Sequence, residues 1–290
     1  MLLAAGGMIA LSTDSLFARL ADADAADILF WIGLLTGTVT AVVVVTSDRT
    51  TPWAIVRRDG APLLIAAALQ AVMISCFVLA VRNTSIANVA AIIAAAPLGA
   101  AALSWLLLRE RTERRVWVAI GVSALGIAIV ISGSVGGGRL EGDLLAIGAV
   151  VAYGFSVVLL RRWTTVSRTM VVGLGGFAIA IVTVWFATLT GHSAKTWFAF
   201  VAMGAVFGPL ARVMLASAPR YLPAAEVALF APLETALAPL WAYLAFDERP
   251  AGATWLGGAV VLAGVLWAVA PRRKSPLTVT VRGLGASQRA

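Results

Sequence analysis

Long apolar runs separated by short polar breaks make up most of the chain. A helix needs about 20 mostly apolar residues to cross the hydrocarbon core of a bilayer, and the pattern predicts an all-α integral membrane protein with ten such transmembrane helices. The loops left between the runs are too short to hold a soluble domain. The ten runs cover residues 2–20, 28–46, 61–81, 86–108, 116–133, 142–160, 170–190, 196–218, 224–246 and 254–270.

The composition supports the same class of protein. Of the 290 residues, 61% are hydrophobic and 12% are charged, which is about half the charged share of an ordinary soluble domain. A soluble fold of this length could not bury so much apolar surface in one core. The chain also lacks the polar bulk that disorder requires. A single cysteine, Cys76, excludes an intrachain disulfide.

The positive charge follows a membrane topology. The net charge is +8, which in a soluble protein would suggest an anionic partner. When the N-terminus is placed inside, the inner loops and the tail hold sixteen lysines and arginines, and the outer loops hold five. Cytoplasmic loops of membrane proteins carry such an excess. We therefore expect both termini to be cytoplasmic and expect no nucleic-acid partner.

The two halves of the chain share a short motif. The segment Leu-Leu-Arg-Glu-Arg at 107–111 precedes Ala-Phe-Asp-Glu-Arg at 245–249 by 138 residues. Chance similarity is the alternative in sequence rich in alanine, valine and leucine, but charged residues and tryptophans argue against it. The same offset aligns Asn88 with Glu226, Trp117 with Trp255 and Gly126 with Gly264.

An odd number of helices in each copy makes the repeat inverted. A slightly different offset aligns residues 10–19 with 152–161, so each copy holds five helices and the second crosses the membrane in the opposite sense. Inverted repeats are a transporter architecture in which the substrate lies near the midplane between the halves. We expect a first five-helix repeat over 1–135, a second over 139–271 and a basic cytoplasmic tail over 272–290.

The paired helix-end motifs and the ten-helix, two-copy arrangement resemble the drug/metabolite transporter superfamily, and within it the EamA-type exporters. The motif at 107–111 is similar to the helix-end signature of that family, and residues 246–249 are similar to its second copy. The resemblance covers all ten helices. It implies a bacterial inner-membrane exporter of small metabolites, for which amino acids are one substrate class, as in the YddG-like exporters. It also implies a central cavity lined by the first, third, fourth, sixth, eighth and ninth helices.

Four ionisable side chains lie inside the predicted spans and more than one residue from either end, where each one is costly. On a rise of 1.5 Å per residue, Arg212 lies roughly 12 Å deep and Glu234 roughly 16 Å deep, so these two could pair across neighbouring helices. Such a pair is either a structural ion pair or a substrate clamp or coupling site. Glu226, near a helix end, either faces the cavity or reaches headgroups and water. The fourth group is Asp14.

The ninth apolar run carries carboxylates and aromatic residues on one helical stripe. A lipid-facing surface would not mix these residue types, so the stripe should face the cavity or another helix. Taken singly, each aromatic residue can equally be ordinary packing. The stripe consists of Glu226, Phe230, Glu234, Leu237 and Trp241.

Two further groups of residues are candidates for the cavity wall. Asp14 lies in a polar run of the first helix, which aligns with a run of the sixth that holds Tyr153 and Ser156. Asp14 either binds a substrate ammonium, carries a proton, or hydrogen-bonds to neighbouring hydroxyls. On the third helix, Met73 and Phe77 lie one turn apart and offer an adaptable apolar wall or simple core packing.

Prolines mark the expected bending points. Pro97, Pro209, Pro232 and Pro239 interrupt the fourth, eighth and ninth helices, and each removes a backbone hydrogen bond and favours a kink. The Gly-x-x-x-Gly spacing at 33–37 is a weak signal for close helix packing.

Enzyme chemistry has no support in the sequence. The only histidine, His192, lies in a predicted outer loop, and no metalloprotease helix, nucleophile elbow or phosphate-binding loop is present. We therefore expect no enzymatic activity, no cofactor and no metal. A multimeric pore stays open as a rival class, which saturable counterflow would separate from a carrier.

The sequence and the resemblance together favour a secondary transporter that exports small metabolites, with aromatic or other amphipathic amino acids as the substrates, by alternating access. An amino acid needs an anionic and a cationic partner, which Arg212 with Asp14 or a glutamate could supply. The alternatives are a nucleotide-sugar or sugar-phosphate exchanger and a multidrug exporter. Proton coupling is a hypothesis resting on Asp14 and Glu234. The expected partners are the small-molecule substrate and membrane lipids, with the chain a monomer or weak homodimer.

Overall fold

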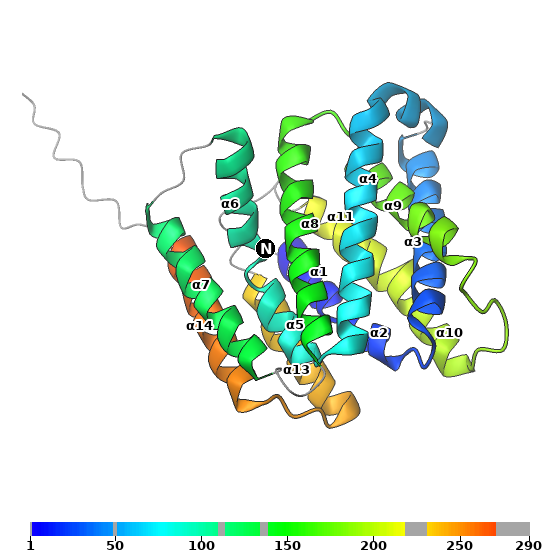
Figure 1. The fold of residues 1–290 in the computed structure, drawn as a ribbon. Helices are drawn as coiled ribbons and strands as arrows, with labels where there is room; N and C mark the ends of the chain where they lie inside the picture. The colour runs from blue at the N-terminus through cyan, green and yellow to red at the C-terminus, as the bar shows by residue number, and fades with distance from the viewer. Residues whose placement is uncertain (1, 49–50, 110–113, 134–138, 218–230, 271–290) are drawn as a thin grey trace, which may run out of the picture.

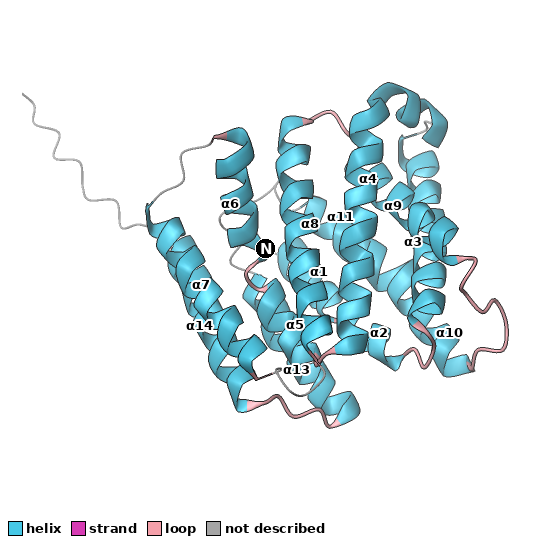
Figure 2. Ribbon diagram, viewed as in Figure 1, coloured by secondary structure: helices cyan, strands magenta, loops and turns pink. Residues whose placement is uncertain are grey.

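A computed structural model describes residues 2–48, 51–109, 114–133, 139–217 and 231–270, and all the regular structure in this part of the chain is helical (Figures 1 and 2). The helices follow the order α1 Leu2–Ser12, α2 Asp14–Leu20, α3 Ala25–Asp48, α4 Pro52–Asn83, α5 Ile86–Ile93, α6 Ala96–Leu108, α7 Arg114–Ser132, α8 Leu140–Arg162, α9 Arg168–Thr183, α10 Ala194–Val201, the π-helix η1 Ala202–Phe207, α11 Gly208–Ser217, α13 Ala231–Phe246 and α14 Gly252–Val269.

The helical class predicted from the apolar runs is confirmed. By length and hydropathy, five of the described helices are candidate membrane spans, and the bent pair α5 and α6 makes a sixth. The apolar parts of α9, α13 and α14 are shorter. One predicted boundary was wrong, since the helix expected over 170–190 ends at Thr183. The helix expected over 61–81 follows a kink at Gly60, and a further helical segment from Pro52 precedes that kink. The start of the ninth predicted run lies outside the described residues.

Polar residues and prolines break the longer helices. Between α1 and α2, the hydroxyls of Ser12 and Thr13 donate to carbonyls three residues back and so compete with the helical hydrogen bonds. The pair α5 and α6 bends by 42° just before Pro97, which occupies the first turn of α6. In α4, Gly60 adopts φ 55° and ψ −139°, values outside the helical region that glycine tolerates best.

Two helix pairs approach so closely that only glycine fits between them. A Cβ on Gly33 of α3 would lie 2.6 Å from the carbonyl oxygen of Gly176 on α9, and a Cβ on Gly176 would lie 2.6 Å from that of Gly33. On α7, a Cβ on Gly126 would lie 2.7 Å from the carbonyl oxygen of Gly257 on α14. The glycine spacing at 33–37 therefore does mark a helix contact, and reciprocal contacts of this kind are expected when a two-fold axis relates two halves.

The remaining contacts follow the same two-fold pattern. The third predicted run packs against the sixth (α4 on α8), and the eighth packs against the first (α11 on α1). Likewise α6 packs on α8, and α13 packs on α1. If the two halves of the chain are exchanged, the contact of α4 with α8 becomes the contact of α11 with α1. In the same way, the contact of α6 with α8 becomes the contact of α13 with α1, as an inverted repeat requires.

The two copies of the helix-end motif share one backbone geometry. Arg109 directly follows α6 and Asp247 directly follows α13, and both have left-handed φ values, 52° and 50°. Among the described residues other than glycine, only Arg109 and Asp247 have a positive φ. A left-handed residue ends many helices by redirecting the chain. The alignment of 107–111 with 245–249 thus corresponds to a repeated structural turn.

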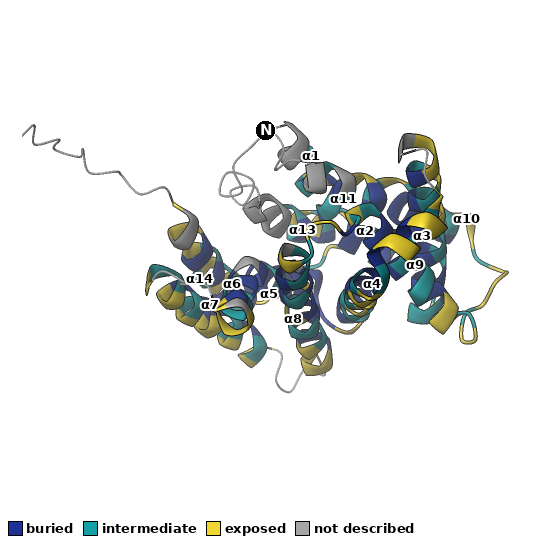
Figure 3. Cartoon of the chain, turned by 90° about the horizontal axis from the view of Figure 1, so that it is seen from above, coloured by how far each residue is buried: buried dark blue, intermediate teal, exposed yellow. Residues whose placement is uncertain are grey.

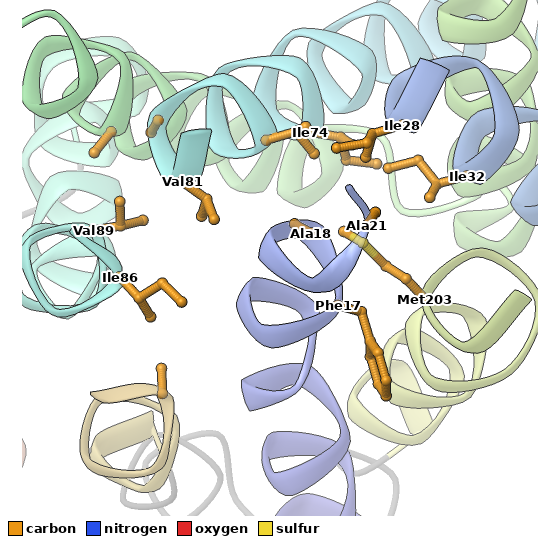
Figure 4. Close-up of a cluster of buried hydrophobic side chains, with 14 of the residues drawn as sticks. Phe17, Ala18, Ala21, Ile28, Ile32, Ile74, Val81, Ile86, Val89 and Met203 are labelled. Atoms are coloured by element: carbon orange, nitrogen blue, oxygen red, sulfur yellow. The ribbon is translucent and has the colours of Figure 1, made fainter. Parts of the chain in front are cut away.

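The main core surrounds the short helix α2. Figure 4 shows α2 in the middle of a cluster of buried side chains, with Ile28 and Ile32 of α3 on one side and Ile86 and Val89 of α5 on the other. Exposed residues lie on the outward faces of the bundle (Figure 3). Many of the exposed residues are large and apolar, among them Leu125, Val182 and Trp255. An apolar exterior around a helical core is what a lipid environment requires.

Candidate functional site

A buried ion pair joins the two halves at the break in the first helix. Asp14 is the first residue of α2, and its Oδ2 lies 3.5 Å from Nη2 of Arg212 on α11. The side chains are 4% and 19% exposed. A charged hydrogen bond normally measures about 2.7–2.9 Å, so the pair is loose. The other carboxylate oxygen, Asp14 Oδ1, is buried and has no hydrogen-bond partner among the described residues.

The structure shows one of the partners that the sequence left open for Arg212. Asp14, Glu234 and another glutamate are the candidate anions. The structure pairs Arg212 with Asp14 because α11 packs directly against α1, which brings this arginine to the first helix. Glu234 lies within α13, but its side chain is outside the described part of the structure.

A hydrogen bond from α13 lies next to this pair. The indole Nε1 of Trp241 donates to Oγ of Ser12 at 3.0 Å, two residues before Asp14. Ser12 in turn donates to the carbonyl of Ile9. The sequence placed Trp241 on a cavity-facing stripe, and its indole does point at the polar run of the first helix. Ser12 is buried.

Two small pockets lie close to the charged pair. One is lined by Leu11 and Ser15 of the first helix, by Phe77 of α4, and by side chains of α5 and α13. The other is lined by Arg212, Thr36 and Met203 together with residues of α4 and α9. The walls of both pockets are mainly aliphatic; Ser15, next to Asp14, lines the first, and Arg212 lines the second.

The other candidate residues are distributed more widely. Met73 and Phe77 are partly buried against the main core, Ser156 is buried, and Tyr153 is exposed on α8. Pro97, Pro209 and Pro239 lie at or within the helices where breaks were expected, and Pro209 is the second residue of α11, which follows η1. Pro232 lies in the first turn of α13, with its side chain outside the described part. Glu226 and Phe230 lie outside the described residues.

A polar network that sequence reasoning missed occupies one end of the bundle. We call it the Arg19 end; it holds the C-termini of α2 and α4 and the N-termini of α5, α8 and α14 (bottom of Figure 1). Arg19 Nη1 lies 3.4 Å from Glu248 Oε2, and Nη2 donates to the carbonyls of Val81 and Thr84. Glu248 Oε1 accepts from the backbone N–H of Ile86 at 3.0 Å, which satisfies a free donor at the start of α5.

A second part of the network is fully buried. Asp143 accepts from Thr84 Oγ1 at 2.8 Å and from Asn88 Nδ2 at 3.2 Å. Asn88 Oδ1 accepts from Thr254 Oγ1 at 2.6 Å. The sequence carries only indirect signals for this network. Glu248 belongs to the repeated motif, and Asn88 aligns with an acidic residue, but Arg19 counts as a loop charge in the predicted topology and nothing in the pattern singles out Asp143.

The opposite end, which we call the Arg58 end, carries fewer such contacts within the described residues. Asp59 pairs with the neighbouring Arg58 at 2.7 Å and accepts from the backbone N–H of Ser167 at 3.0 Å. Arg115 donates to the carbonyl of Ala270. Among the described residues, no group of three or more histidines, cysteines or acidic residues could hold a metal ion.

The fold and the site define a class of membrane protein. Helical halves related by a two-fold pattern, with charged groups buried between them, are the architecture of a secondary carrier. The chain belongs to the EamA-like transporter family, whose model matches residues 1–132 and again residues 140–270. The protein is accordingly a multi-pass membrane transporter of small molecules, which works in a lipid environment.

Further comparisons concern the fold alone. No curated protein matches the chain. A solved structure titled "Crystal structure of protein" superposes with a TM-score of 0.63 at 18% sequence identity, covering 92% of this chain and 96% of that one. Nearly the whole length is therefore shared, and at this identity the likeness extends to the architecture and no further.

Proposed function

We propose that the protein is a secondary transporter that exports amino acids by alternating access, and that Asp14 and Arg212 bind the substrate. The buried pair between the two halves is the observation that carries this proposal. Buried ionisable groups are expensive in a membrane and usually serve a purpose. Ser15, next to Asp14, lines one small pocket and Arg212 lines another, which is the setting in which a solute would be held.

The charges of the pair match a zwitterion. Asp14 Oδ1 has no partner among the described residues and can accept from a substrate ammonium, while the guanidinium of Arg212 can hold a carboxylate through two parallel hydrogen bonds. The aliphatic walls of the flanking pockets favour an apolar amino-acid side chain. A sugar phosphate fits less well, because its double negative charge would lie beside the carboxylate of Asp14.

The proposal includes an orientation. The excess of arginine and lysine in alternate loops favours an orientation with the Arg19 end outside and both termini inside, and the membrane we propose is a bacterial inner membrane. The two moving halves would cover 1–135 and 139–271, with Pro97, Pro209, Pro232 and Pro239 as bending points. The bend before Pro97 and the π-helix before Pro209 are distortions at which a helix can change shape.

Efflux from liposomes tests the function. Purified protein would be reconstituted with a mixture of labelled amino acids inside, and Asp14→Asn and Arg212→Gln would be compared with the wild type. Asp247→Asn and Arg249→Gln serve as controls, because these two charges are exposed. We expect saturable efflux, acceleration by unlabelled substrate on the far side, and loss of both in the Asp14 and Arg212 variants.

Three results would contradict the proposal. Efflux that does not saturate would indicate a pore. Efflux unchanged in well-folded Asp14 and Arg212 variants would make the pair structural. If no amino acid leaves the liposomes but phosphorylated sugars are exchanged, the substrates are sugar phosphates and not amino acids. An imposed pH gradient tests proton coupling in the same assay, since transport that ignores both the gradient and Asp14→Asn is not coupled through this carboxylate.

A further inference from the structure

We propose that the polar network at the Arg19 end is a latch that closes this end of the transporter and must break in every transport cycle. The latch consists of Arg19, Thr84, Asn88, Asp143, Glu248 and Thr254. The inference rests on the proposed alternating access, but it concerns residues outside the proposed binding site and predicts behaviour that can be measured without a substrate.

The contacts of the latch with Asp143, Glu248 and Thr254 cross between the two halves, whereas the hydrogen bonds from Arg19 and Asn88 to Thr84 lie within the first half. Arg19, Thr84 and Asn88 lie in the first matched segment of the chain, and Asp143, Glu248 and Thr254 lie in the second. The ion pair, the hydrogen bonds to Asp143 and the bond between Asn88 and Thr254 therefore hold one half to the other. A motion that separates the two halves at this end would break these contacts and leave those within the first half in place.

The latch lies one helical turn from a pocket. Ser15 lines the pocket that also contains Phe77, and Arg19 follows Ser15 by one turn of α2. Ile86 lines the same pocket with its side chain, while its backbone N–H donates to Glu248. Releasing Glu248 would therefore free both α2 and the start of α5, which form the wall between this pocket and the Arg19 end.

The contacts are strong enough to close the end and are still reversible. The side chains of Arg19 and Glu248 are 27% and 17% exposed, so salt screens their attraction less than it screens a surface pair. Arg19 Nε, however, is buried without a hydrogen-bond partner among the described residues. Water would satisfy this donor once the end opens, which offsets part of the cost of breaking the ion pair.

Accessibility of a single cysteine tests the latch. Cys76 is the only cysteine in the chain, so Cys76→Ala gives a background into which Ser15→Cys can be introduced. A membrane-impermeant maleimide would be added separately to right-side-out and inside-out vesicles. We expect slow labelling from the Arg19 side in the otherwise wild-type protein, and labelling on the order of tenfold faster when Glu248→Gln or Arg19→Gln shifts the population towards the open state.

Matched variants separate opening from loss of structure. Asp247→Asn, beside Glu248 but exposed, should leave the labelling rate unchanged. Thr254→Val removes the hydroxyl that donates to Asn88 and should raise the rate less than Glu248→Gln. Ser123→Cys, buried on α7 away from the latch, reports global loosening and should not respond.

The outcomes distinguish the latch from the proposed function. Faster labelling of Ser15→Cys from the Arg19 side, with Ser123→Cys unchanged, supports the latch even if no amino acid is transported. Unchanged labelling in Glu248→Gln, Arg19→Gln and Thr254→Val overturns it even if efflux is normal. Equal acceleration at Ser15→Cys and Ser123→Cys also overturns it, because these contacts would then hold the fold together rather than close one end.

Discussion

The central ion pair and the network at the Arg19 end are both polar clusters buried between the halves, but their carboxylates differ in how well they are satisfied. Both oxygens of Glu248 have donors, and Asp143 accepts from two side chains. Asp14 has one guanidinium at 3.5 Å and a second oxygen with no partner within the described residues. Satisfied buried groups rigidify a structure, whereas an unsatisfied one is costly unless another partner arrives.

This difference indicates that the two clusters have different roles. A cluster whose groups already bind one another gains nothing from a solute, so its natural role is to hold the two halves in one arrangement. A loose pair with a free acceptor can exchange its internal partner for a ligand. Substitutions should therefore affect transport at the centre and stability or closure at the Arg19 end.

The largest expected effect is at the central pair. Asp14→Asn or Arg212→Gln removes one partner and leaves the other charge buried, which costs about 3–5 kcal/mol for typical buried pairs. We expect each single variant to unfold at lower temperature and to lose roughly 100-fold or more in kcat/KM for efflux. The double variant should recover stability, because neither charge remains, without recovering transport.

A double-mutant cycle of thermal unfolding and efflux measures this result. Normal transport by the double variant would mean that the charges do not contact the substrate. The central pair would then be structural, as the network at the Arg19 end is expected to be, and the proposed difference in role between the two clusters would be wrong.

The next largest effect is expected at Asp143. Asp143→Asn can keep an oxygen at the position of Oδ1, which accepts from Thr84 and Asn88, but it puts an N–H₂ group at the position of Oδ2, and an unsatisfied buried donor costs about 1–3 kcal/mol. Unfolding of the purified protein should become easier by that amount, while the KM of efflux stays unchanged. Glu141→Gln is the matched control, since Glu141 is exposed in the same first turn of α8. A raised KM would instead place Asp143 in the binding site.

A smaller effect is expected where α13 meets the central site. Ser12→Ala and Trp241→Phe each remove the hydrogen bond from the indole, worth about 0.5–1.5 kcal/mol. Their effects on thermal unfolding should be less than additive in the double variant, because both remove one interaction. Trp255→Phe controls for loss of an indole at an exposed position. Fully additive effects would show that the bond contributes little.

The sequence predicted the helices better than it predicted their contacts. Apolar runs and breaking residues are local signals, so the all-α class, the bend before Pro97 and the repeated turn at the two motif copies could be read from the chain. The shortening of α9 could not, because residues 184–190 are as apolar as much of the helix before them.

Single residues of the candidate site could be predicted from the sequence, but their arrangement in space could not. Asp14 and Arg212 could be singled out because a charge inside an apolar run is expensive. Their pairing could not be, since Glu234 was an equal candidate and the choice depends on α11 packing against α1. Arg19, Asp143 and Glu248 looked like solvated charges, because each lies near a helix end. Only the convergence of several helix ends buries them.

The smallest effect is expected at the residue next to the latch. Asp247 and Glu248 are adjacent carboxylates, but the side chain of Asp247 is 78% exposed and faces Arg249 at 3.8 Å. Exposed ion pairs contribute little, and asparagine tolerates the left-handed φ of 50° at this position. Asp247→Asn therefore removes only a charge, and thermal unfolding should shift by less than about 0.5 kcal/mol. A shift as large as that of Glu248→Gln would mean that net charge, rather than the contacts across the halves, governs the Arg19 end.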